Sequence, residues 1–163
     1  MTGGFRGRAF LGRALVGVWA VLILMVPAGT LADPAKTVLY SFCSKPHCSD
    51  GSEPAAVLIF DSSGNLYGTT VYGGTSNAGT VFKLAPDGTE TVLHAFKGSP
   101  SDGSNPSAGL IFDRSGNLYG TTQFGGTSNA GTVFKLAPDG TETVLHAFKG
   151  SPSDGSNPSA GLI

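Results

Sequence analysis

Residues 64–111 read GNLYGTTVYGGTSNAGTVFKLAPDGTETVLHAFKGSPSDGSNPSAGLI, and residues 116–163 repeat this stretch with two adjacent changes. The two copies begin 52 residues apart (116 − 64). Self-similarity at a fixed period of this length is typical of repeat architectures, in which each unit is one supersecondary element that stacks on its neighbours. The chain is therefore predicted to fold as a tandem array.

A third, more diverged copy lies upstream of these two. Residues 37–42 match residues 91–96 at an offset of 54, and residues 50–54 match residues 102–106 at an offset of 52 (91 − 37 and 102 − 50). The first copy therefore carries two extra residues. The predicted organisation is a signal peptide at 1–32, a partial first repeat with this insertion at 33–63, a repeat at 64–115 and a truncated repeat at 116–163.

Four short segments in each period are rich in β-branched and aromatic residues and are predicted to be strands. In the first full copy they are residues 66–70, 80–84, 89–96 and 108–112. Turn-forming residues separate them, and Pro86-Asp87-Gly88 between two apolar segments is the clearest hairpin signal. No segment after the leader shows a 3.6-residue apolar period, so the chain is predicted to be all-β.

Four strands in about 50 residues match the size of a β-propeller blade. Apolar residues lie on both faces of the predicted strands, as in Val92-Leu93, and neighbouring blades of a propeller cover both faces of each sheet. The predicted fold is a partial β-propeller of about two and a half four-stranded repeats of about 52 residues, after an N-terminal signal helix.

A propeller closes with roughly four to eight blades, which is more than this sequence holds. Three interpretations stay open: the sequence is a fragment of a longer product, several chains assemble into one structure, or the repeats form an open array. The sequence stops at residues 160–163, inside a predicted strand and with no capping repeat, which favours the fragment.

The first residues have the three-part layout of a secretory signal peptide. Three arginines precede an apolar run from Ala14 to Val26 and then a stretch of small residues. The run is shorter than the roughly 20 residues that a spanning helix needs, so cleavage is expected and no stable membrane span after it. Cleavage after Ala28 and cleavage after Ala32 both satisfy the small-residue rule, and Ala32 is preferred because the repeat begins soon after it. The protein is predicted to be secreted or to lie on a bacterial cell surface.

Cleavage after Ala32 removes three of the ten basic residues and leaves seven against eleven acidic ones, a formal charge of −4 (7 − 11). The remaining Lys and Arg residues are scattered singly. A mildly acidic chain without a basic patch is a poor partner for nucleic acid, so nucleic-acid binding is excluded.

Cys43 and Cys48 are the only cysteines, and they lie in the insertion of the first copy. In an oxidising compartment such a pair is expected to form a local disulfide, worth about 2 kcal/mol by the loop-closure estimate. A metal site is the alternative, but two thiolates with only His47 between them are too few ligands for a closed tetrahedral site.

The ordered motifs of the repeat are Gly-Asn-Leu-Tyr-Gly-Thr-Thr, Gly-Gly, Gly-Thr-Val-Phe-Lys-Leu, Pro-Asp-Gly-Thr-Glu-Thr-Val-Leu, Asp-Gly-Ser-Asn-Pro and Ala-Gly-Leu-Ile. This series resembles the Gloeo/Verruco, or GloVer, tandem repeat over residues 36–163. The resemblance implies an exported bacterial protein, displayed on the cell surface or released from it, in a family whose members carry varied C-terminal anchoring signals. It implies no activity for any residue, and this sequence shows no such signal, so the mode of attachment stays open.

His94 and His146 are the residues that an enzyme would use first, since imidazole titrates near neutral pH. The first copy has Tyr40 at the equivalent position, so the position is predicted to accept any ring with a polar tip and to be structural. Ser and Thr residues lie outside any nucleophile motif, and no phosphate-binding Lys follows the Gly-Gly pairs. No catalytic, cofactor-binding or metal-binding residue is predicted.

Aspartates recur next to Gly or Ser, at Asp50, Asp102 and Asp154 in all three copies and at Asp61 and Asp113 in two. They are predicted to form turns. Calcium (Ca²⁺) binding by their carboxylates is the alternative, but a calcium loop concentrates several carboxylates within a dozen residues, and these are isolated.

The two differences between the full copies are Val71-Tyr72 against Gln123-Phe124, just ahead of the Gly-Gly pairs. If this loop lies at the rim of a blade, Tyr72 and Phe124 form a varied contact surface for a glycan or protein ligand. Recent drift would leave the same two substitutions, and that alternative stays open.

The sequence favours an exported surface or binding module that displays similar loops several times. The alternative is an enzyme, because propellers with motifs similar to Asp-x-x-Gly-Asn-Leu-Tyr include metal-dependent lactonases. Such a hydrolase or lactonase would complete its metal site with residues beyond this sequence. Unique His, Glu or Asp residues in particular blades would distinguish the enzyme from a uniform display module.

Overall fold

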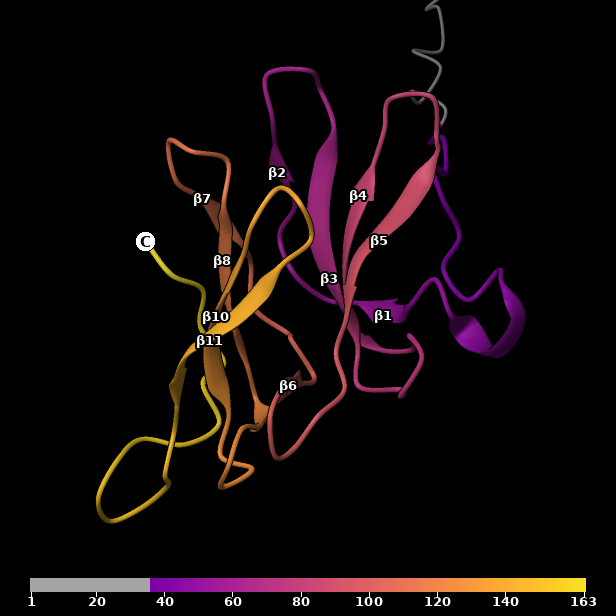
Figure 1. Ribbon diagram of the computed structural model, residues 1–163. Coiled ribbons are helices and arrows are strands. Elements are labelled where there is room, and N and C mark those ends of the chain that lie inside the picture. Colours follow the sequence, from indigo (N-terminus) through magenta and orange to yellow (C-terminus); the bar gives the residue numbers. More distant parts are fainter. Residues whose placement is uncertain (1–35) are drawn as a thin grey trace, which may run out of the picture. The chain divides into compact units, whose positions relative to one another are not determined.

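The computed structural model describes residues 36–163, which fold into short antiparallel β-strands (Figure 1). The predicted signal peptide at 1–32 lies outside the described residues. Within 36–163 the only helical segment is a 3₁₀ turn, η1 (Pro46–Cys48), and no helix there is long and apolar enough to cross a membrane. The all-β prediction is therefore confirmed.

The first sheet is a meander in which each strand pairs with the next one in the chain. Its strands are β2 (Ile59–Phe60), β3 (Leu66–Tyr72), β4 (Thr80–Leu84) and β5 (Glu90–Ala95). A short strand, β1 (Ser52–Pro54), pairs with the end of β3 that β2 leaves free, so β1 and β2 share one edge of β3. The predicted Pro86-Asp87-Gly88 hairpin joins β4 to β5, where Ala85 N–H donates to Thr89 O at 2.9 Å.

The second sheet has the same meander order, 52 residues further along the chain. Its strands are β7 (Ile111–Phe112), β8 (Leu118–Thr122), β10 (Thr132–Leu136) and β11 (Glu142–Ala147). A separate pair, β6 (Gly103–Ser104) with β9 (Phe124–Gly125), repeats the contact between β1 and the end of β3. The magenta and pink sheet and the orange and yellow sheet in Figure 1 are therefore two versions of one unit.

The predicted strand at 108–112 is longer than the observed one. Only β7, its last two residues, enters a ladder, and it pairs with β8 of the following sheet. The preceding part runs beside the first sheet, where Ala108 is buried and its carbonyl accepts a hydrogen bond from the Thr69 hydroxyl at 3.4 Å. Because this contact uses a side chain, residues 108–110 are held in place without forming a ladder.

The main hydrophobic core lies between the two sheets. Phe96, which follows β5, is fully buried against Phe134 of β10, with ring centroids 5.1 Å apart. The other buried residues of this core are Ala78, Val81, Leu110, Leu118 and Leu136. The first sheet thus covers the apolar face of the second sheet with Phe96, the phenylalanine that follows its last strand.

The same contact recurs at the other face of the first sheet. There Phe42, from the upstream copy, packs on Phe82 with ring centroids 4.7 Å apart, beside Leu66 and Leu84. The predicted disulfide between Cys43 and Cys48 forms directly after Phe42, in the loop that contains the insertion. Both faces of the first sheet are therefore covered, each through a phenylalanine at an equivalent position.

Replacing Phe96 by Ala is expected to lower the free energy of unfolding by about 3–5 kcal/mol, because it removes a fully buried ring and leaves a cavity between the sheets. Urea denaturation followed by circular dichroism measures this loss. Phe60→Ala is the matched control, since its ring is 68% exposed and its removal should cost less than about 0.5 kcal/mol. Equal losses in the two variants would contradict the assigned core.

Candidate functional site

The last residue of β3 holds an aromatic side chain at the surface, directly before a loop whose backbone is fixed by hydrogen bonds. Tyr72 is followed by Gly73 and Gly74, both at positive φ. A Cβ at Gly73 would lie 2.6 Å from the carbonyl oxygen of Cys48, so only glycine fits the close approach. Gly73 N–H donates to Asn77 Oδ1 at 2.9 Å, and Gly74 N–H donates to Cys48 O at 3.0 Å.

The second copy builds the same loop around Phe124. Gly125 N–H donates to Asn129 Oδ1 at 2.9 Å, and Gly126 N–H donates to Asp102 O at 2.8 Å. Tyr72 and Phe124 are each 40% exposed. The two residues singled out by the sequence comparison thus occupy equivalent, half-exposed positions on equivalent loops.

The neighbouring difference, Val71 against Gln123, comes with a change in contacts. Gln123 Nε2 donates to Ser107 Oγ at 2.9 Å, and the residue that corresponds to Ser107 one period earlier (107 − 52) is Ala55. The polar side chain therefore has a polar partner in one copy, where the other copy has two apolar residues.

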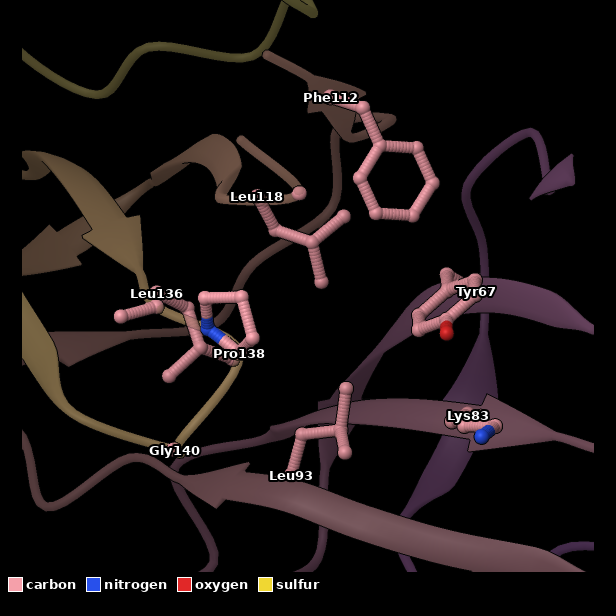
Figure 2. A pocket seen from close by; sticks show the side chains of 10 residues that line it. Tyr67, Lys83, Leu93, Phe112, Leu118, Leu136, Pro138 and Gly140 are labelled. Carbon is pink, nitrogen blue, oxygen red and sulfur yellow. The ribbon is translucent and has the colours of Figure 1, made fainter. Parts of the chain in front are cut away.

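A cavity of about 170 Å³ lies between the two sheets (Figure 2). Its walls are mostly apolar, with Tyr67 and Lys83 as its longest polar side chains; the labelled lining is Tyr67, Lys83, Leu93, Phe112, Leu118, Leu136, Pro138 and Gly140. The Tyr67 hydroxyl already donates to Asp61 Oδ2 at 3.0 Å. Ligand pockets usually enclose about 300–1,000 Å³, so this cavity is a gap in the packing rather than a substrate site.

Three titratable side chains meet where the first sheet contacts the second. His94 comes from β5, Asp102 from the loop before β6, and Glu142 from the start of β11. Ligand atoms of the three lie within 4.8 Å of one another, and His94 Nε2 is 3.2 Å from Asp102 Oδ2. Only 15% of the His94 side chain and 7% of the Asp102 side chain are exposed.

The two carboxylates respond differently to this environment. Burial acts to raise the pKa of Asp102, but the hydrogen bonds from His94 and from the Lys97 N–H outweigh it and lower the pKa. Burial raises the pKa of Glu142, and the negative charge of Asp102 raises it further. Asp102 is thus the stabilised anion of the pair.

The ring position of His94 has the same hydrogen-bond partner in each copy. Tyr40 Oη donates to Asp50 Oδ2 at 2.8 Å, and His146 Nε2 lies 2.9 Å from Asp154 Oδ2. Each ring thus bonds the aspartate of its own copy, as a structural role requires. Burial would raise the pKa of Asp50, but hydrogen bonds from Ser44 and Tyr40 hold it at about 2.

Glu142 is the member of this cluster that the sequence reasoning missed. It lies 40 residues from Asp102 (142 − 102), in the next copy, and only the contact between sheets brings it close. A signal was present, since Glu90 and Glu142 open the same Glu-Thr-Val-Leu motif. The repeated motif does not show that Glu142 lies close to His94 and Asp102, because that depends on which faces of the two sheets pack together.

Asp61 and Asp113 each accept a full set of hydrogen bonds inside a turn. The Asp61 carboxylate accepts from Ser63 N–H, from Asn65 through both its backbone and its side chain, and from Tyr67 Oη, at 2.7–3.0 Å. The Asn65 side chain is the largest cause that holds the pKa of Asp61 at about 2. Asn117 does the same for the pKa of Asp113, also about 2.

A carboxyl-carbon NMR titration should therefore find Asp61 and Asp113 with pKa values of about 2. Asn117→Ala is expected to raise the pKa of Asp113 towards about 3.9 and leave that of Asp61 unchanged, so the first turn is the internal control. Because the folded pKa is depressed, the turns contribute stability at neutral pH that is lost as pH falls from about 4 through about 2. A wild-type Asp113 that titrates near 3.9 would contradict the assigned turn.

A family model described as Gloeobacter/Verrucomicrobia repeat matches residues 26–163. The match includes both full copies and the upstream copy with the two cysteines. No curated protein matches the chain.

Proposed function

The chain belongs to the Gloeobacter/Verrucomicrobia repeat family, and we propose that it is an exported bacterial module that binds a glycan or protein through repeated aromatic loops. The observation that carries this proposal is the pair Tyr72 and Phe124, each 40% exposed directly before an equivalent hydrogen-bonded Gly-Gly loop. Exposed rings at equivalent positions of a repeat are suited to contact with a ligand.

The loops supply what an aromatic contact needs. A ring offers a large contact area at a low cost in conformational entropy, and stacks on the apolar face of a sugar or on an apolar side chain. The glycine backbone of each loop is held by hydrogen bonds before any ligand arrives, which reduces the ordering cost of binding. Two or more such loops on one chain raise the total affinity through effective concentration.

In this proposal the sheets are blades of a β-propeller. The meander order β2-β3-β4-β5 and the covering of both faces of the first sheet support that architecture. Loops at equivalent positions of successive blades would then lie on one rim of the molecule, facing the same ligand.

Export is the second part of the proposal. The arginines, apolar run and small-residue stretch of residues 6–32 support it, and so does the disulfide, because such bonds persist in oxidising compartments. Cys43 and Cys48 close a loop that no other copy has. A chain that gains a disulfide in its added loop is suited to the cell exterior.

Binding is tested with a glycan array and with pull-down on insoluble cellulose, chitin and peptidoglycan. The double variant Tyr72→Ala/Phe124→Ala is expected to lose at least ~10-fold in affinity, and each single variant less, because one loop remains. Phe60→Ala removes an exposed ring away from these loops and should bind like wild type. A double variant that is folded and binds as well as wild type would contradict the role of the loops.

Export is tested by expressing the full chain in a bacterial host and determining the mass and N-terminal sequence of the product outside the cytoplasm. The expected product begins at Asp33, after cleavage at Ala32. Ala32→Arg should block this cleavage and leave either the precursor or a product that begins at Gly29. A wild-type chain that keeps Met1 and stays in the cytoplasm would rule out export.

A further inference from the structure

The contact between the two sheets brings one imidazole nitrogen and two carboxylate oxygens together, from three separate segments. His94, Asp102 and Glu142 each offer one such atom, and these atoms lie within 4.8 Å of one another. We propose that these three side chains form a binding site for a divalent transition-metal cation, with Zn²⁺ as the best match. This proposal is independent of the aromatic loops.

The cluster has more negative charge and more acceptor capacity than the described residues satisfy. Oε1 of Glu142 is buried and accepts no hydrogen bond from any residue in 36–163, and Oε1 of Glu90, the equivalent atom in the preceding contact, is also without a hydrogen bond there. Within the same range no Lys or Arg forms an ion pair with Asp102 or Glu142. A buried carboxylate oxygen without a partner is unfavourable, and a bound cation is one group that relieves this cost.

The contact between the upstream copy and the first sheet has an equivalent arrangement of side chains. There Tyr40, Asp50 and Glu90 stand at the positions of His94, Asp102 and Glu142. Lys45 supplies a cation, with its Nζ 2.8 Å from Glu90 Oε2, and the Glu90 side chain is 99% buried (1% exposed). A positive charge is therefore built into one of the two contacts.

The second contact lacks that lysine among the described residues, and it has an imidazole where the first contact has a phenol. Lys45 lies in the loop that carries the two-residue insertion, and the shorter loop after Phe96 places no ammonium group on Glu142. In the same place the tyrosine of the first contact is replaced by His94. A contact with an imidazole and without a tethered lysine favours a bound metal ion in place of the ammonium group.

The donor set selects the kind of metal. Ca²⁺ and Mg²⁺ prefer oxygen ligands throughout, whereas an imidazole nitrogen favours Zn²⁺ and its neighbours. Three protein ligands leave a fourth tetrahedral position for water, as in open zinc sites. The site is thus distinct from the calcium loops that isolated aspartates alone would suggest.

The surroundings hold two of the three ligands in place. Asp102 accepts hydrogen bonds from Lys97 N–H at 2.8 Å and from Gly103 N–H at 2.6 Å, so its carboxylate is oriented by the backbone. The His94 ring packs edge-on against Phe96, with centroids 4.7 Å apart. Such outer contacts orient ligands in metal sites. A bound ion would link β5 and the loop before β6 to β11, and so join the two sheets.

The test is isothermal titration of the purified, EDTA-dialysed full chain with ZnCl₂, alongside thermal unfolding with and without the metal. Wild type is expected to bind one Zn²⁺ per chain and to unfold at a higher temperature in its presence. Glu142→Gln, which keeps the size of the side chain, should weaken Zn²⁺ binding by at least ~100-fold, since even outer contacts are worth about 10–100-fold. CaCl₂ should bind at least ~10-fold more weakly than ZnCl₂.

Two matched variants locate the site. Glu90→Gln changes the equivalent residue of the contact that already contains Lys45, and His146→Ala removes the exposed equivalent of His94; both should keep wild-type Zn²⁺ affinity within about 2-fold. The visible absorption of tetrahedrally bound Co²⁺ should appear in wild type and these two variants and be absent in Glu142→Gln. A folded wild type that binds no Zn²⁺, or equal losses in Glu142→Gln and Glu90→Gln, would overturn the proposal.

Discussion

The packing of one phenylalanine from each copy onto the sheet of the next copy is the interaction on which this structure depends. A four-stranded sheet of about 40 residues has two apolar faces and cannot cover either by itself. Phe96 covers the second sheet at Phe134, and Phe42 covers the first at Phe82. Room for these rings comes from glycine in the adjoining strand, since a Cβ at Gly120 would lie 2.8 Å from the Phe134 ring. The fold therefore needs more than one copy of the repeat, because the apolar face of each sheet is covered only when a neighbouring copy supplies the phenylalanine ring.

The same contact has an electrostatic consequence. Two residues before the phenylalanine lies His94, and the strand that approaches from the next sheet starts with Glu142. Burying the aromatic ring therefore also brings a carboxylate of one copy towards the ring and aspartate of another. The first contact relieves the resulting charge with Lys45. Packing and charge are thus coupled in this repeat, and a change in the loop after the phenylalanine alters how the charge is compensated.

Local features were predictable from the sequence, and contacts between copies were not. The strand at 80–84, the Pro86-Asp87-Gly88 hairpin and the disulfide each depend on residues close in the chain, and all three are observed. Tyr72 and Phe124 were found by comparing copies, and their loops depend on nearby glycines. The pairing of β7 with the following sheet and the approach of Glu142 to His94 depend instead on how two sheets face each other. A sequence period reveals that units are equivalent but leaves open which faces meet.

Identical sequences in two surroundings separate the effect of the neighbour from that of the sheet itself. Leu93 packs against the second sheet, whereas Leu145, the same residue one period later, is 51% exposed. The His94 side chain is 15% exposed and that of His146 is 49% exposed, although each keeps its aspartate partner. The hydrogen bond therefore belongs to the single unit, because it forms with or without a covering sheet. The burial of His94 depends instead on the contact between two units. That burial also raises the free-energy cost of an unpaired carboxylate in the same contact. Any chemistry of the His94 cluster beyond its histidine–aspartate pair is thus a property of two adjacent copies and of neither copy alone.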